Sequence, residues 1–136
     1  MPDPASKLLS FEDAPRAIDA LRAAGRRIVQ CHGTFDLLHP GHIHHLQEAR
    51  ACGDALVVTI TADAHVNKGP GRPVFTERLR AHPLAALECV DVVVIVPYPA
   101  AVEAITCVRP DVYVKGTEYR DAANDPTGNI HDDRRA

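Results

Sequence analysis

The sequence predicts an α/β protein with a Rossmann-like, doubly wound parallel sheet in a single domain. Short apolar segments rich in β-branched residues alternate with segments of helical periodicity between residues 11 and 114. This alternation is typical of right-handed βαβ crossovers, which build a parallel sheet with helices on its faces. The chain has 136 residues, 46% of them hydrophobic, which is enough for one core without disulfides or a structural metal.

The first predicted helix spans residues 11–24, with Ser10 as its N-cap and Gly25 directly after its end. An apolar run at residues 28–31 has the pattern of a buried parallel strand, and Gly33 ends it. A helix followed by a strand is therefore the first expected unit of the fold.

The second helix is expected over residues 41–52, because Ile43, Leu46 and Ala49 share one of its faces. A strand is expected at residues 55–60. The loop that follows this strand is rich in glycine and proline, which predicts irregular backbone there.

Thr76 is the expected N-cap of a third helix that ends at Leu87, and Pro83 is expected to bend or break that helix. The remaining elements are a strand, a short helix and a strand, at residues 90–96, 100–107 and 111–114. The chain accordingly divides into a helical extension, a main domain and a polar tail, at residues 1–25, 26–120 and 121–136.

Composition excludes several classes of partner. The net charge of -3 gives no overall attraction to nucleic acid, although a local basic site can still hold a phosphate. The N-terminus has no signal pattern, and no apolar run approaches the roughly 20 residues of a membrane helix. The four cysteines form no CxxC pair, so they are expected to be reduced and structural. We expect a cytoplasmic protein without a nucleic-acid or membrane partner.

The stretch GTFDLLHPGH, residues 33–42, follows the first apolar strand. His42 falls in the first turn of the second helix, where backbone N–H groups and the helix dipole favour an anion. Gly41 has no side chain to keep a phosphate away. His39 lies three residues before His42, and Thr34 adds a hydroxyl donor. The pattern predicts a phosphate-binding site at the carboxyl edge of the sheet.

Further polar residues follow other strands. Lys68 stands in the loop after the second strand and Lys115 follows the last one, both at carboxyl ends. Cations there can position and neutralise a phosphate ester without a protein nucleophile. Asp36 either orients a neighbouring donor or stabilises a turn through its own side chain. Asp63 and Asp91 are expected to be structural turn residues.

The histidines allow a second interpretation, a metal-binding cluster formed by His39, His42, His44 and His45. Imidazole ligands need convergent geometry and usually a carboxylate or thiolate partner. His44 falls on the predicted solvent side of the helix. We therefore favour the phosphate site and expect no protein-bound metal.

Residues 33–42 resemble the signature of the cytidylyltransferase-like nucleotidyltransferases, whose HxGH motif reads here as His39-Pro40-Gly41-His42. The glycerol-3-phosphate cytidylyltransferase and heptose-1-phosphate adenylyltransferase branches are the most similar. Later segments are similar to the adenylyltransferase branch in order and spacing, namely Lys68 with Arg72-Pro73-Val74, Glu77-Arg78, residues 86–91 and residues 114–119. The resemblance covers Arg26 to Tyr119.

The resemblance implies transfer of a nucleoside monophosphate from ATP or CTP to a phosphorylated sugar or polyol, with release of pyrophosphate. The acceptor's own phosphate attacks the α-phosphorus, and Mg²⁺ arrives bound to the triphosphate. A homodimer is implied by the resemblance alone. The sequence does not choose between the two nucleotides and does not name the acceptor.

Residue roles carry over from the matching motif positions. By resemblance, His39 and His42 stabilise charge on the triphosphate in the transition state, and Lys68 contacts the phosphates. Thr34 and Phe35 line the nucleotide site. The remaining nucleotide-binding candidates are Gly41, Arg78, Lys115 and Gly116.

The chain departs from the family near its C-terminus, where members usually carry a further Ser/Thr-rich motif at a helix N-terminus. Residues 132–136 instead resemble the start of a helix, so we expect a truncated chain. The alternative function is a nucleotide-binding or regulatory domain that keeps the phosphate site and lacks turnover.

Overall fold

A parallel sheet forms the centre of the computed structural model, which describes residues 4–33, 35, 38, 40–65 and 76–114. Its five strands lie in the order β1-β4-β3-β2-β5. The strands are β1 (Leu8–Leu9), β2 (Ile28–Gly33), β3 (Ala55–Thr61), β4 (Val92–Val96) and β5 (Val112–Val114). The helices are α1 (Ala14–Ala23), α2 (Pro40–Arg50), α3 (Glu77–Ala86) and α4 (Ala101–Val108), with 3₁₀ turns η1 (Pro4–Lys7) and η2 (Asp63–His65). The predicted fold class is confirmed.

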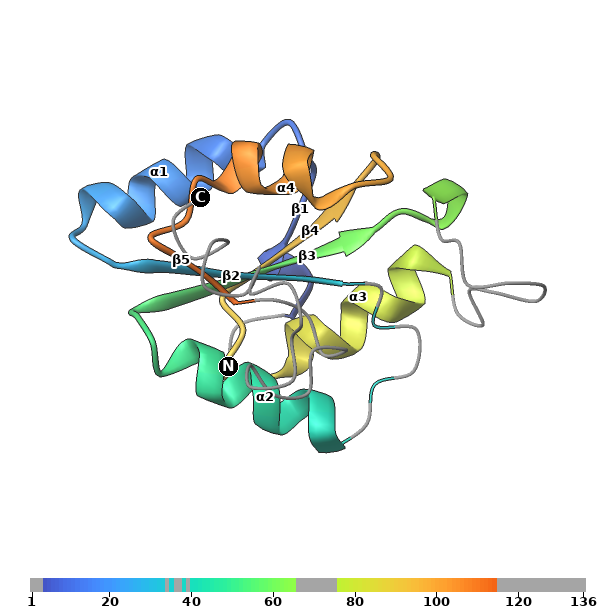
Figure 1. Ribbon diagram of the computed structural model, residues 1–136, viewed down its shortest axis with the longest axis horizontal. Coiled ribbons are helices and arrows are strands. Elements are labelled where there is room, and N and C mark those ends of the chain that lie inside the picture. The colour runs from blue at the N-terminus through green and yellow to red at the C-terminus, as the bar shows by residue number, and fades with distance from the viewer. Residues whose placement is uncertain (1–3, 34, 36–37, 39, 66–75, 115–136) are drawn as a thin grey trace, which may run out of the picture.

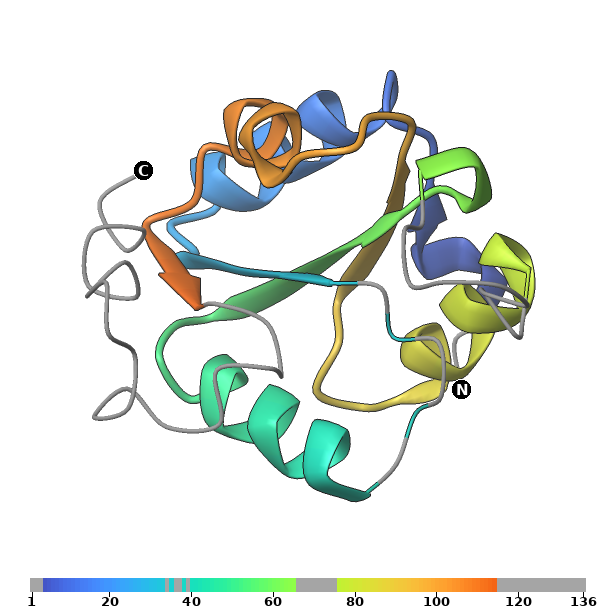
Figure 2. The same ribbon diagram turned by 45° about the vertical axis from the view of Figure 1, so that its right-hand side comes forward.

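Helices cover both faces of the sheet. Figures 1 and 2 show α1 and α4 over one face and α2 and α3 over the other. Each helix pair buries its own apolar cluster, with Leu46 and Val58 on the α2/α3 side and Ile18 and Val57 on the α1/α4 side. Val57 and Val58 separate in this way because successive strand residues point to opposite faces. Every residue of β3 is buried, as expected for a central parallel strand.

The strand order reverses at β2. Strands β2, β3 and β4 follow one another across the sheet, whereas β5 returns to pair with the other side of β2. Gln30 thus lies between Val57 of β3 and Tyr113 of β5. Ligands of open α/β sheets bind beyond the carboxyl ends of the strands at such a reversal. The topology therefore favours a ligand site beyond the end of β2 at Gly33.

Helix α1 begins later than the sequence predicts. The Oγ of Ser10 accepts a hydrogen bond from the backbone N–H of Asp13 at 3.0 Å and closes a turn that precedes the helix. The helix itself starts at Ala14. Gly25 has a φ of 84°, a left-handed conformation that glycine adopts at no steric cost. The predicted glycine at the helix end is confirmed, and the predicted start is wrong by one turn.

Helix α3 keeps its predicted cap and is not broken. The Oγ1 of Thr76 accepts a hydrogen bond from the N–H of Leu79 at 3.4 Å, which confirms the N-cap. Pro83 lies inside α3, and the helix continues to Ala86. Of the two predicted outcomes, a bend or a break, the break is therefore excluded. Pro83 has no N–H to donate to the carbonyl of Leu79, four residues earlier. Both residues are exposed, so water can bind that carbonyl instead.

Strand β1 was not predicted. Leu8 and Leu9 pair with Val93 and Val94 of β4, so residues near the N-terminus form one edge of the sheet. The Nζ of Lys7 also donates a hydrogen bond to the carbonyl of Leu87 at 3.1 Å. Two residues are too few to show the alternation that identifies a strand.

The four cysteines are free thiols, as predicted. Cys31 lies in the core, where burial raises the pKa of its thiol to about 12. Cys52 is exposed, and Cys89 and Cys107 are half-buried. Burial also raises the pKa values of Cys89 and Cys107, which keeps both in the protonated form.

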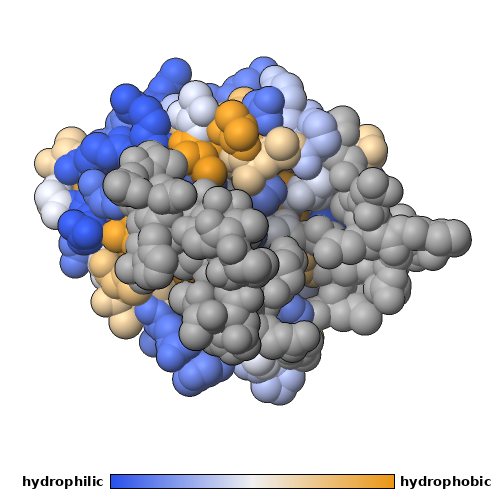
Figure 3. Space-filling view, in the orientation of Figure 1, coloured by the Kyte–Doolittle hydropathy of each residue, from blue (hydrophilic) through white to orange (hydrophobic). Residues whose placement is uncertain are grey.

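The surface over α4 is partly apolar. Figure 3 shows hydrophobic residues there beside a largely hydrophilic surface, and Val102 of α4 is 66% exposed. None of the helices in the described ranges has the length and apolar character needed to cross a bilayer.

Candidate functional site

The turn after β2 is shaped by Phe35. This residue has a φ of 50°, a left-handed conformation that is uncommon outside glycine, and its side chain is buried. A β-carbon on Gly33 would lie 3.0 Å from the Cε2 of Phe35, so glycine lets the ring pack closely against the end of the strand. The ring belongs to the apolar cluster on the α2/α3 side. Strained backbone held by packing of this kind is concentrated at functional sites.

Helix α2 begins beyond the carboxyl end of β2 (Figure 1). Pro40 is its first residue, where the missing N–H costs no helical hydrogen bond. Gly41 follows and is exposed, and the first turn contains no acidic residue. The partial positive charge of the helix end is therefore not neutralised within that turn. This is the environment that the sequence predicted for a phosphate.

The structure brings Phe35 and His42 together. Their rings meet edge to face, with centroids 5.8 Å apart and planes at 67°. His42 is half-buried in the first turn of α2, so the contact fixes its ring at the helix end while part of it stays accessible. Gly41 is its chain neighbour. The other predicted site residues, Thr34, His39, Lys68, Lys115 and Gly116, lie outside the described residues, as does Asp36.

Arg78 lies elsewhere along the sheet edge. It is exposed at the start of α3 and lines a pocket of about 410 Å³ together with Glu77 and residues of β1 and β4. Among the described residues, neither Phe35 nor His42 lines this pocket. The role of Arg78 in nucleotide binding stays a prediction.

Arg80, which the sequence reasoning passed over, is buried at the same end of α3. Its guanidinium contacts the Oδ1 of Asp63 at 2.7 Å, and the N–H of Asp63 donates to the Oε1 of Glu77 at 2.9 Å. Asp63 is the first residue of η2, two positions after the end of β3, so these contacts join η2 to the first turns of α3. A sequence signal existed, because Arg80 lies four residues before the buried Leu84 and shares its helix face.

Asp63 and Asp91 have the structural roles that the sequence predicted. Asp91 accepts a hydrogen bond from the N–H of Leu56 at 2.8 Å and pairs with the Nε of Arg50 at 3.2 Å. Arg50 also donates to the carbonyl of Gly53 at 2.8 Å. These contacts tie the end of α2 to the start of β3.

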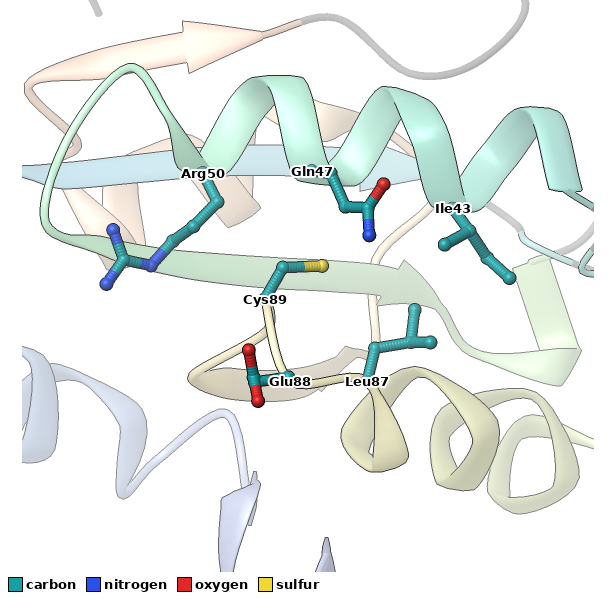
Figure 4. A pocket seen from close by; sticks show the side chains of 6 residues that line it. All are labelled: Ile43, Gln47, Arg50, Leu87, Glu88 and Cys89. Atoms are coloured by element: carbon teal, nitrogen blue, oxygen red, sulfur yellow. The ribbon is translucent and has the colours of Figure 1, made fainter.

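A groove of about 440 Å³ lies between α2 and the connection from α3 to β4 (Figure 4). Its walls are formed by Ile43, Gln47, Arg50, Leu87, Glu88 and Cys89. None of the predicted site residues within the described ranges lines it, and Arg50 is already engaged by Asp91. His42 is not one of its lining residues, although the next residue, Ile43, is.

The other face of β2 carries polar side chains. His32 and Thr59 are direct neighbours in the register, and the Nδ1 of His32 lies 2.8 Å from the Oγ1 of Thr59. The Nε2 of Gln30 donates to the same oxygen at 3.0 Å. Burial lowers the pKa of His32 to about 4, so its ring is neutral at neutral pH. Sequence reasoning missed these residues, because their contacts depend on the pairing of β2 with β3.

The described histidines do not support a metal centre. His44 is exposed and lies 3.5 Å from the Oε2 of Glu48, one helical turn away, which confirms its predicted solvent position. Across the described ranges, no group of three or more histidine, cysteine, aspartate or glutamate side chains is placed to hold a metal ion.

The fold and the turn after β2 define a class: an α/β protein in which a helix begins beyond the carboxyl end of a central parallel strand. The model of the family described as cytidylyltransferase-like matches residues 30–132. The chain therefore belongs to the cytidylyltransferase-like family, and the resemblance found in the sequence is confirmed.

Individual relatives agree with this assignment. The "Bifunctional protein HldE" of Azorhizobium caulinodans is 44% identical over 118 residues, which cover 85% of this chain and 25% of that protein. The protein of the same name from Syntrophotalea carbinolica is 43% identical over 116 residues, covering 84% and 24%. The chain thus spans about a quarter of the length of these curated relatives.

A solved structure shares the fold. The lipopolysaccharide core biosynthesis protein from Thermoplasma volcanium superposes with a TM-score of 0.64 at 29% identity. The match covers 79% of this chain and 88% of that one. The two chains therefore share the overall fold.

Proposed function

We propose that this chain transfers a nucleoside monophosphate from ATP or CTP to a phosphorylated sugar or polyol and releases pyrophosphate. One observation carries the proposal: the first turn of α2 contains His42 and no acidic residue, and it lies beyond the carboxyl end of β2. The N–H groups of a first helical turn have no carbonyl of the same helix to bind. Together with the helix dipole they attract a triphosphate.

The name of the matched structure supports the kind of acceptor. The matched structure is that of a lipopolysaccharide core biosynthesis protein, and lipopolysaccharide cores are built from sugars. A phosphorylated sugar is therefore the acceptor class that we favour, with polyol phosphates as the next.

The chemistry needs positioning and charge neutralisation. An oxygen of the acceptor phosphate attacks the α-phosphorus, and the bond from this phosphorus to the oxygen that bridges to the β-phosphate breaks. Pyrophosphate leaves with that oxygen. Because the acceptor phosphate is already an anion, the chain has no proton to remove, and stabilisation of the transferring phosphates is its main task.

His42 is the described side chain that we assign to this stabilisation. Its ring is held by Phe35 at the end of α2, so it is oriented before the nucleotide arrives. His39 and Lys68 share the task in this proposal, on the basis of the family motif. Imidazoles and N–H groups bind phosphate oxygens, whereas Mg²⁺ prefers oxygen ligands. The magnesium ion therefore enters on the triphosphate as part of the substrate.

The test is a pyrophosphate-release screen of ATP and CTP against a panel of phosphorylated sugars and polyols. We expect release with one nucleotide and at least one acceptor. Nucleotide binding seen by calorimetry without any release would favour a binding or regulatory domain. Absence of both binding and release would overturn the proposal.

A further inference from the structure

Four polar side chains form a network on the α1/α4 face of the sheet: Gln30, His32, Thr59 and Thr61, here called the β2–β3 polar network. Gln30 and His32 follow Ile28 at two-residue intervals along β2, so they point to the face that α1 and α4 cover. All four are buried or half-buried. The network runs from the centre of the sheet to its carboxyl edge, where His32 directly precedes Gly33.

The hydrogen bonds of the network converge on Thr59. Its Oγ1 accepts from the Nε2 of Gln30 at 3.0 Å and lies 2.8 Å from the Nδ1 of His32. Its hydroxyl also reaches the carbonyl of Cys31 at 3.4 Å. The imidazole is therefore oriented from inside the sheet by a threonine that a buried glutamine holds in turn.

Two acceptor atoms on this side of the sheet have unmet hydrogen-bonding capacity. Within the described residues, the Oε1 of Gln30 has no partner although Gln30 is 0% exposed. The Oε1 of Glu103, in the first turn of α4, is also buried without a partner. Unpaired buried acceptors are costly, and they are satisfied when a ligand or water brings O–H or N–H donors.

The outer nitrogen of His32 has capacity left for a ligand. Its Nε2 lies 3.5 Å from the Oγ1 of Thr61, at the limit of a hydrogen bond. Burial keeps the ring neutral, since the pKa of His32 is lowered to about 4. With the Nδ1 of this neutral ring engaged by Thr59, the Nε2 offers one hydrogen-bonding position, as donor or acceptor according to the tautomer. A hydroxyl group can match either role, and the ring gives no charge to attract a phosphate.

We propose that the β2–β3 polar network is the part of the site that binds a hydroxyl group of the acceptor, through the Nε2 of His32. The inference rests on the proposed function and deepens it. The nucleotide lies at the α2 end, and the acceptor approaches the same strand end from the α1/α4 side. The acceptor class is then a phosphate ester with free hydroxyl groups near its phosphate.

The first test uses the imidazole signals of ¹⁵N-labelled protein, with the His32 signal assigned by its loss in His32→Gln. Mannose 1-phosphate, glycerol 3-phosphate and ethyl phosphate, which has no hydroxyl group, are titrated with a non-hydrolysable ATP analogue present. We expect the His32 signal to move with at least one hydroxylated phosphate and to stay in place with ethyl phosphate. A His32 signal that moves with none of them, or equally with ethyl phosphate, overturns the inference.

The nucleotide titration separates this inference from the proposed function. The ATP or CTP analogue alone is expected to move the signal of His42 at the start of α2. If it moves no signal, the proposed function fails, whatever His32 does. If it moves His42 and the hydroxylated phosphates leave His32 in place, only the acceptor inference fails.

The second test is kinetic and uses His32→Phe, with His82→Gln on the exposed side of α3 as the matched control. Loss of one hydrogen bond to the substrate weakens its binding by roughly tenfold. We expect His32→Phe to raise the KM for the acceptor by about tenfold or more and to leave the KM for the nucleotide unchanged. Partial recovery in His32→Gln, which restores a donor and an acceptor, is expected. Equal changes in both KM values would contradict a role specific to the acceptor.

Discussion

Phe35 orients the side chain of His42 through a ring contact. Phe35 takes a left-handed backbone conformation so that its ring can pack into the core and meet His42 edge to face. The cost of that backbone conformation is offset by burial of the ring, which is 6% exposed. The histidine at the helix end is therefore oriented by packing before any ligand binds.

His42→Ala tests this arrangement at the level of turnover. We expect pyrophosphate release to fall by about 100- to 1,000-fold, as for the loss of an oriented group that stabilises transition-state charge. His44→Ala is the matched control, because His44 is exposed on the same helix. Near-normal release by the first variant, with an unchanged melting temperature, would contradict the role assigned to His42.

The ion pair of Asp63 and Arg80 is expected to matter for stability. The Arg80 side chain is fully buried, so Asp63→Ala leaves a guanidinium with one carboxylate fewer in the interior. We expect the free energy of unfolding to fall by about 2 kcal/mol in urea titrations. Asp19→Ala is the control, since Asp19 pairs with Arg22 at the surface, and its loss should cost less than about 1 kcal/mol. Equal losses of unfolding free energy in the two variants would mean that burial of Arg80 does not increase the contribution of its ion pair to stability.

His32 should make stability depend on pH. Its pKa is about 4 in the folded chain and 6.5 in the unfolded one, so between these values the unfolded state binds more protons. Stability from the neutral ring is complete above pH 6.5 and is lost as the pH falls from 6.5 toward 4. The slope has an upper bound of about 1.4 kcal/mol per pH unit. The difference in unfolding free energy between the wild type and His32→Gln, followed from pH 7 to pH 5, is expected to shrink in this window. A difference independent of pH would show that His32 is not held neutral.

At the level of elements, α3 tolerates a proline in its interior. Pro83→Ala adds one N–H at a position where the helix already has regular geometry and improves helix propensity. The loss of proline also frees the unfolded chain, which opposes this gain. We expect a net stabilisation of about 1 kcal/mol in urea titrations. A loss of stability would mean that the effect on the unfolded chain dominates.

Most elements were predictable because their patterns are local. The run Val92–Val96 and the faces of α2 and α4 show their period in a single segment. The two-residue β1 shows no period, and its pairing with β4 depends on residues more than 80 positions away.

The candidate site was predictable only in part, because some of its contacts join residues that are far apart in the sequence. The helix-end position of His42 follows from neighbouring residues. By contrast, the burial of Arg80 and the contact of His32 with Thr59 follow from how separate elements pack. The motif indicated Arg78 as a candidate but not the burial of Arg80 two positions later, because a motif gives the residue type and order but not the depth of a side chain.

For the whole molecule, β1 protects one border of the sheet. Removal of residues 1–9 leaves the outer side of β4 without its partner, and an unpaired strand edge is a template for association with other chains. We expect the truncated protein to unfold at a lower temperature and to form larger species at high concentration in size-exclusion chromatography. Leu8→Pro should have a weaker effect in the same direction. An elution volume and a melting temperature equal to those of the full chain would show that β1 does not protect this edge.

The position of β5 beside β2 has a consequence for biosynthesis. The N–H of Ile28 donates a hydrogen bond to the side chain of Asp111 at 2.7 Å, so β2, the strand that leads to the proposed anion site, is bordered by residues about 83 positions later in the chain. Closing so long a loop is entropically expensive, and such pairings form late. A nascent chain on the ribosome therefore cannot complete this end of the sheet until its fifth strand has left the exit tunnel, and we expect nucleotide binding to begin only then.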